Sequence, residues 1–289
     1  MSFRFQVWLI FLAPVLIMAG LLVVGQRIPV PELGRGYVVR IELPEEAPQL
    51  DLPEILGSED PSRPLVVIDA GHGGHDPGAT GEGFQEKRIA LGLAIALRDR
   101  LIEEGGIRVA LTRSDDRFLV LEDRADIARQ LRADLFLSIH ADSAGDYTET
   151  RGASIYTLSE SASDEEAALL AARENRADEI NGVSLAGESD QVGAILFDLS
   201  QRRAQEESIE FADLITREGT GLIRFHSDPR RSANFVVLQS PDLPSILFEA
   251  GFVSNRDDAR RLSSAEGRAV FADVLDRAIR IYFARNSGV

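Results

Sequence analysis

The sequence predicts an α/β protein with a mixed, mostly parallel central sheet flanked by helices and a helical insert over the active-site cleft. Three observations predict this fold. Apolar, β-branched segments typical of buried strands alternate along the chain with amphipathic helical segments. The first of these strands runs directly into a glycine-rich loop. Histidine and glutamate residues stand at or near strand ends, where ligands bind in such sheets.

Composition limits the classes of function. The chain has 289 residues with 44% hydrophobic and 27% charged residues, which is ordinary for a globular protein. Its formal net charge of −16 argues against a nucleic acid as the main partner. Because the chain has no cysteine, it has no disulfide, no thiolate ligand and no cysteine nucleophile. Any metal must therefore be held by histidine and carboxylate.

The N-terminal segment predicts export. Residues 7–25 are uncharged and follow Arg4, so residues 1–25 are either a signal peptide or a membrane anchor. About 20 apolar residues suffice to span a bilayer, which favours an anchor, whereas Val23 and Gly25 are small enough to precede a cleavage point. Residues 26–64 are rich in proline and acid and predict a linker, with one strand over residues 37–43.

Residues 65–285 carry the alternating pattern of one domain. Its first strand, "LVVIDAG", is apolar from Leu65 to Ile68, continues with Asp69 and ends in glycine. The first helix, Glu86–Glu104, repeats Ile89, Leu93, Leu97 and Leu101 on one face. The other predicted elements are strands over 108–113, 134–142, 152–159, 234–241 ("NFVVLQSP") and 245–252, and helices over 119–131 and about 265–284.

A helical insert is predicted over residues 159–219. Its first helix, "SDEEAALLAARENRADEI", begins with serine and acids that suit a helix N-terminus. Its second amphipathic stretch repeats Ile195, Leu199, Ile209 and Leu214, and we expect it to be an ordinary layer covering the sheet.

Four residues have the chemistry of a metal-dependent hydrolase. Zinc hydrolases often use two histidines and one carboxylate, and leave one position for water. His72 follows the first strand, Glu86 opens a helix one loop later, and His140 ends another strand, so these three residues are candidate zinc ligands. Glu249 is the candidate general base and acid.

Each of these residues also has a structural alternative. His72 could bond to backbone in a turn, His140 could be a satisfied histidine at a strand end, and Glu86 could favour a helix dipole. Glu249 is harder to explain in this way, because an unpaired carboxylate in an apolar strand is costly. Together the structural alternatives require four coincidences. Spacing alone does not decide between them.

Three further residues have weaker indications. Asp69 precedes the loop and could orient His72 as an outer acceptor. His75 lies three residues beyond His72. We expect it either to have no role in the site or to contact a ligand rather than the metal. For His226, structural and functional roles are equally supported.

Four segments resemble a known family. "VVIDAGHGGHDPGA", the helix-opening Glu86, "SIHAD" and "ILFEAGFVSN" resemble the zinc-dependent N-acetylmuramoyl-L-alanine amidases of type 3, over about residues 65–283. The resemblance implies a mixed sheet flanked by helices, one zinc ion held by His72, Glu86 and His140, and Glu249 as the catalytic residue. The implied reaction hydrolyses the amide between N-acetylmuramic acid and L-alanine in peptidoglycan. "SIHAD" departs from the pattern by having Asp142 where asparagine is common.

The insert resembles that of the division-associated amidases of Gram-negative bacteria. In those enzymes an inserted helix obstructs the zinc cleft until a LytM-type activator displaces it, and the resemblance implies the same autoinhibition in the periplasm here. Glu174, Glu179 and Glu188 are candidate inhibitory ligands. Residues 26–64 leave no room for the separate N-terminal targeting domain those enzymes usually carry.

Two arginines, Arg113 and Arg124, could contact carboxylates of the stem peptide. The sequence favours ion pairs with neighbouring acids instead, namely Asp115, Asp116 and Asp123.

Two other functions remain as alternatives. One is a zinc hydrolase of another bond, such as a stem-peptide carboxypeptidase, which the order of the ligands disfavours. The other is a catalytically silent module that binds the wall or an activator. The intact set of His72, Glu86, His140 and Glu249 argues against it.

Overall fold

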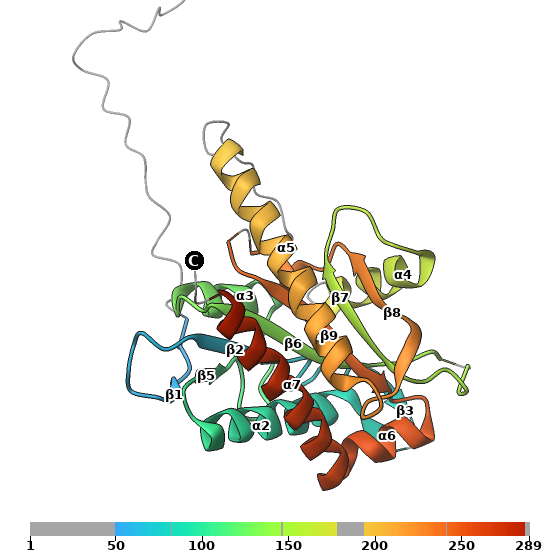
Figure 1. Cartoon of the computed structure of the whole chain (residues 1–289). Coiled ribbons are helices and arrows are strands. Elements are labelled where there is room, and N and C mark those ends of the chain that lie inside the picture. Colours follow the sequence, from blue (N-terminus) through green and yellow to red (C-terminus); the bar gives the residue numbers. More distant parts are fainter. Residues whose placement is uncertain (1–49, 82, 146, 178–193, 241, 287–289) are drawn as a thin grey trace, which may run out of the picture. The chain divides into compact units, whose positions relative to one another are not determined.

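The computed structural model describes residues 50–81, 83–145, 147–177, 194–240 and 242–286. Within these residues a seven-stranded sheet has the order β1-β5-β2-β6-β9-β7-β8 (Figure 1). Its strands are β1 (Leu56–Gly57), β2 (Leu65–Ala70), β5 (Arg108–Leu111), β6 (Leu135–Asp142), β7 (Ala153–Leu158), β8 (Phe225–Ala233) and β9 (Ser245–Phe252). A separate hairpin pairs β3 (Thr80–Gly81) with β4 (Phe84–Gln85). The helices are α2 (Glu86–Glu104), α3 (Leu121–Gln130), α4 (Glu165–Glu174), α5 (Ala194–Gly219), α6 (Arg256–Ser263) and α7 (Ala265–Asn286).

The predicted mixed, mostly parallel sheet is confirmed. Parallel pairings join β5 to β2, β2 to β6, β6 to β9, and β7 to β8. Antiparallel pairings join β1 to β5 and β9 to β7. The carboxyl ends of β2, β6 and β9 therefore lie at the same edge of the sheet, as the parallel arrangement requires.

Helices cover both faces of the sheet, which explains why β2, β6 and β9 are buried along their whole lengths. Successive strand residues point to opposite faces. Val66 and Ile68 pack with residues of α2, α5 and α7, which lie over one face in Figure 1. Val67 and Phe136 pack on the other side with residues of α3 and α4.

Several predicted elements agree with the structure to within a few residues. The helix Glu86–Glu104 has its predicted bounds, and Ile89, Leu93, Leu97 and Leu101 are buried as expected. β9 spans its predicted residues, and α7 runs a little further than predicted. α6 and the β3–β4 hairpin were not predicted.

The predicted strand over residues 234–241 is wrong. Its apolar centre forms a short 3-10 helix, Val236–Leu238, whose Val237 and Leu238 are buried. The strand in this region is β8, which ends just before the predicted strand begins. β8 contains His226. β8 was missed because it is polar, half-exposed and interrupted by Pro229, as edge strands often are.

The structure also adds an edge strand within the stretch predicted to be a linker, because β1 pairs with β5. The predicted strand over residues 37–43 and the apolar segment 7–25 lie outside the described residues. None of the helices in the described part of the chain combines the length and apolar character that a membrane span needs.

A buried carboxylate ties the end of β9 to its neighbours. Asp258 of α6 is 3% exposed, and its Oδ2 accepts hydrogen bonds from the backbone N–H groups of Gly152 (2.8 Å) and Phe252 (3.2 Å). Gly251 lies so close that a Cβ there would be 2.8 Å from the same oxygen. Asp258 therefore fixes the end of the strand that carries Glu249.

We expect Asp258→Ala to lower the free energy of unfolding by about 1–3 kcal/mol, because it leaves buried N–H groups without an acceptor. Asp258→Asn keeps an acceptor oxygen and should lose less. Chemical denaturation measures both, with the exposed neighbour Asp257→Ala as the control. Equal stability of Asp258→Ala and Asp257→Ala would contradict this role.

Candidate metal centre

Five titratable side chains from five segments meet beyond the carboxyl ends of β2, β6 and β9. His72 lies two residues after β2, Glu86 is the first residue of α2, and Glu174 is the last residue of α4. His140 and Glu249 are register partners in β6 and β9. All five are buried, with exposed fractions between 1% and 8%.

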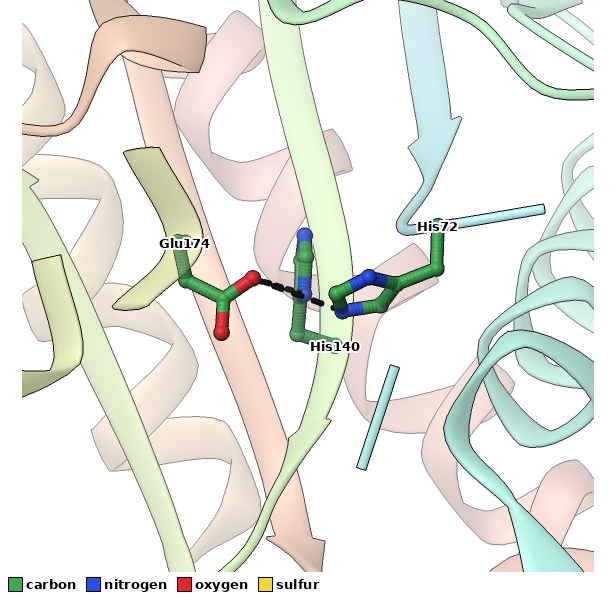
Figure 2. A group of neighbouring side chains, drawn as sticks. All are labelled: His72, His140 and Glu174. Atoms are coloured by element: carbon green, nitrogen blue, oxygen red, sulfur yellow. Dashed lines mark ion pairs between the residues drawn. The ribbon is translucent and has the colours of Figure 1, made fainter. Parts of the chain in front are cut away.

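Two imidazoles and two carboxylates converge on one point. Glu86 Oε1 lies 3.1 Å from His72 Nε2 and 2.9 Å from His140 Nδ1. Glu174 Oε2 lies 3.3 Å and 3.4 Å from the same two nitrogens. Figure 2 shows the carboxylate of Glu174 pointing from α4 towards both rings. The structure thus brings together the three residues predicted as ligands and one of the three predicted inhibitory glutamates.

The four nitrogen–oxygen separations in this set match the distances between neighbouring ligand atoms of a tetrahedral cation site. Zinc bonds to imidazole nitrogen and carboxylate oxygen of about 2.0–2.1 Å place neighbouring ligand atoms about 3.3 Å apart in a tetrahedron. The four measured separations lie between 2.9 and 3.4 Å. His72 Nε2 is also buried without a hydrogen-bond partner among the described residues. A metal ion would supply the partner that this nitrogen lacks.

The electrostatics of the site favour a cation. Burial alone would lower the pKa of His72, but the carboxylates of Glu86 and Glu174 raise it well above its usual value. Burial alone would raise the pKa of Glu86, but His72 and His140 lower it well below its usual value. The carboxylates around His72 therefore favour positive charge at this position.

Glu249 differs from the other carboxylates because neither of its buried oxygens has a hydrogen-bond partner among the described residues. One oxygen lies within 4.8 Å of ligand atoms of Glu86 and His140. Burial raises the pKa of Glu249 well above its usual value, and the nearby carboxylates of Asp142 and Glu86 raise it further. A carboxylate with free oxygens and a high proton affinity suits a general base and acid.

His72 is oriented by Asp76, which the sequence analysis missed. Asp76 Oδ2 lies 2.7 Å from His72 Nδ1, and Asp76 Oδ1 accepts the N–H of Gly78. The expectation that Asp69 would orient the ring is wrong, because Asp69 bonds to Thr112, Ser138 and Arg124. The signal was present in the sequence as an acid four residues after His72.

Two glycines make room for the ligand side chains. A Cβ on Gly71 would lie 2.4 Å from Cε1 of His140. A Cβ on Gly78 would lie 2.5 Å from Cδ2 of His72 and 2.7 Å from Oε2 of Glu86, and Gly78 also has a φ of +64°. The glycine-rich loop is therefore required by the close approach of the ligands.

A cavity of about 670 Å³ adjoins the site and is bounded by residues of the His72 loop, by Ser143 and Gly145, and by the last turn of α4 with the residues after it. Arg173 of α4 donates to Oδ1 of Asp142 at 2.5 Å and to the carbonyl of Ser143 at 3.2 Å. At its other end, α4 is capped by Asp164, whose side chain accepts the N–H of Ala167. This cap lies within the helix itself, but near the same end Glu166 accepts from Nη1 of Arg231 in β8 at 2.6 Å, so α4 is bonded to other segments near both ends.

The remaining predicted site residues lie apart from this centre. His75 is exposed and packs against Phe118, with ring centroids 4.4 Å apart. His226 of β8 lies beside Arg231, whose Nη2 is 3.1 Å from the Nδ1 of His226, which favours the structural role. Glu179 and Glu188 lie outside the described residues.

The predicted ion pairs of Arg113 and Arg124 are wrong. Arg124 pairs with Asp69 at 3.0 Å, whereas Arg113 donates to backbone carbonyls. The one contact of Arg113 with a predicted acid, Asp115, is to its main-chain oxygen.

The sequence of the chain is similar to those of known amidases. The sequence model of the N-acetylmuramoyl-L-alanine amidase family matches residues 66–280. AmiA of Salmonella typhimurium is 38% identical over 224 residues, which cover 77% of this chain and 77% of that protein. AmiC of Escherichia coli is 37% identical over 225 residues, which cover 77% of this chain and 54% of that protein.

The fold also matches that of a solved amidase structure. The solved structure of N-acetylmuramoyl-L-alanine amidase AmiC2 of Nostoc punctiforme superposes with a TM-score of 0.55 at 28% identity, and the alignment covers 77% of this chain and 98% of that one. The segment matched by the family model contains His72, Glu86, His140, Glu174 and Glu249. The chain therefore belongs to the N-acetylmuramoyl-L-alanine amidase family.

Proposed function

We propose that this protein is a zinc-dependent amidase that hydrolyses the bond between N-acetylmuramic acid and L-alanine in peptidoglycan. The observation that carries the proposal is the convergence of His72 Nε2, Glu86 Oε1 and His140 Nδ1 beside the free carboxylate of Glu249. The names of the relatives support this choice of substrate. The amino-terminal segment supports export, and we propose the periplasm as the site of action.

The donor set supports zinc. Two imidazoles and one carboxylate are the ligands of many catalytic zinc sites, which keep a fourth position open. A zinc ion bound there supplies Lewis acidity, which polarises an amide carbonyl and makes water more acidic. Asp76 holds the ring of His72 in the tautomer with a free Nε2, because Asp76 accepts the proton on Nδ1.

Glu249 performs the proton transfers in this proposal. An amide nitrogen leaves only when it is protonated, so the reaction needs a group that takes a proton from water and returns it to the leaving nitrogen. The free oxygens and raised pKa of Glu249 support that role. No other described carboxylate in the cluster is without a hydrogen-bond partner at both of its oxygens.

Glu174 supports a closed, autoinhibited state. Its Oε2 occupies the position that a fourth zinc ligand would take, and four protein ligands are typical of structural rather than catalytic zinc sites. We propose that α4 must move before water and substrate reach the metal, and that an activator protein of the LytM type moves it during remodelling of the wall or separation of daughter cells.

The test of the activity uses the full-length chain with purified peptidoglycan, with and without a chelator. We expect peptides with a free L-alanine amine, no release with chelator, and one zinc per chain. His140→Ala should lose the zinc, because it removes one of three ligands, whereas His75→Ala in the adjoining loop should keep it. Release of single amino acids from the ends of stem peptides would favour a carboxypeptidase instead.

Glu249→Gln should keep the zinc and lower kcat by about 10²–10⁴-fold, because the amide is similar in shape but cannot accept and return a proton. Zinc content by elemental analysis and turnover on muropeptides provide the two measurements. Loss of zinc together with activity would instead indicate that Glu249 is a ligand.

Glu174→Gln should raise wall hydrolysis in the absence of activator by about tenfold or more, because it weakens the contact that closes the site. A tenfold change corresponds to about 1.4 kcal/mol. The control is Glu165→Gln, an exposed acid in the first turn of the same helix. If Glu174→Gln and Glu165→Gln are equally active, Glu174 does not inhibit the enzyme.

A further inference from the structure

The backbone that carries His72 has an unusual conformation. His72 has a φ of +59°, in the left-handed region that non-glycine residues rarely adopt. The carbonyl groups of Ala70, Gly71 and His72 at the end of β2 all accept hydrogen bonds from arginine side chains. Side chains thus provide the donors that buried carbonyls require.

Two guanidinium groups bind these carbonyls. Arg113 donates through Nε to Ala70 (2.8 Å) and through Nη2 to Gly71 (2.7 Å). Arg124 donates through Nη1 to Ala70 (3.0 Å) and through Nη2 to His72 (3.1 Å). Three consecutive carbonyls are therefore fixed by two planar groups of fixed geometry.

Arg113 also connects the two halves of the metal site. Its Nη2 donates to the carbonyl of Lys87 (2.9 Å) as well as to that of Gly71 (2.7 Å). Lys87 follows the ligand Glu86, and Gly71 precedes the ligand His72. One nitrogen atom thus fixes the spacing between the backbone segments of two ligands.

Both arginines are buried and are held in place. Arg113 and Arg124 are 0% and 2% exposed. Asp69 provides the countercharge for Arg124, at 3.0 Å and 3.3 Å from its Nη1, and is itself held by Thr112 (2.6 Å) and Ser138 (2.7 Å). This explains why an aspartate just before the loop matters even though it does not touch the ring of His72.

We propose that Arg113 and Arg124 are positioning residues of the metal site, which hold His72 in its left-handed conformation and at a fixed spacing from Glu86. The proposal rests on the metal site of the proposed function. Lysine cannot replace either residue, because one ammonium group cannot donate in several directions within a plane as guanidinium does.

The alternative is that the two arginines only stabilise the fold. That role predicts a lower Tm in the variants with an unchanged affinity for zinc. A positioning role predicts weaker zinc binding, by about 10–100-fold as for other residues that orient metal ligands. The two measurements therefore separate the two roles.

The experiment uses the full-length chain with Arg113→Lys, Arg124→Lys and the milder Asp69→Asn. The Kd for zinc is measured by competition with a chromophoric chelator, and the Tm is measured with and without zinc. Arg280→Lys is a matched control, because Arg280 also pairs with an aspartate, Asp276, and donates to a backbone carbonyl, that of Gly105, but lies away from the site.

We expect the zinc Kd to rise at least about tenfold in each arginine variant and less in Asp69→Asn, with Arg280→Lys within about twofold of the unchanged protein. If those of the three site variants that fold bind zinc with an unchanged Kd, the proposal is overturned, even if their Tm falls. If the unchanged protein itself binds no zinc, the proposed metal site fails instead. The two failures are therefore distinguishable.

Discussion

The buried carboxylates at this edge of the sheet form a negative charge that needs a cation. Glu86, Glu174, Glu249 and Asp142 are each at most 6% exposed. Among the described residues, Arg173 is the arginine that forms ion pairs with members of this group. Buried carboxylates are costly unless they are paired, so this cluster is stable only when positive charge is added or protons are bound. This excess of buried negative charge raises both the pKa of His72 and the pKa of Glu249.

The last residue of α4, Glu174, contributes to this charge imbalance. Glu174 adds one more carboxylate to the cluster, which a dication tolerates and neutral imidazoles do not. The apolar face of α4 is small, with Ala167, Leu170 and Ala171 buried against the sheet. A helix with so little apolar contact depends on polar contacts, such as those of Arg173 with Asp142 and of Glu166 with Arg231.

The sequence predicted the parts of the fold that rest on local pattern, and missed those that rest on contacts between distant segments. β2, β6 and β9 are continuous apolar runs, and α2 has a regular apolar face, so both were predictable. The run "NFVVLQSP" has the same composition, yet it turns after Val236 and contacts Asn175, whose side chain bonds to the backbone on both sides of Phe235. The contact of Asp76 with His72, and those of Arg113 and Arg124 with backbone carbonyls, depend on the path of the loop after β2. A repeating apolar pattern does not predict that path.

Two side chains near the end of β6 make different contacts. His140 and Asp142 are two residues apart in β6, and the register of its pairing with β9 shifts between them. The first reaches the metal site, and the second reaches Arg173. An asparagine at position 142 could accept a hydrogen bond from Arg173 but would carry no charge, so the aspartate makes this contact an ion pair. Because the side chain of Arg173 is 41% exposed, solvent screens the pair, and its contribution to stability is modest. The contacts of Glu174 with His72 and His140 are buried, so solvent screens them less than it screens the pair of Arg173 with Asp142.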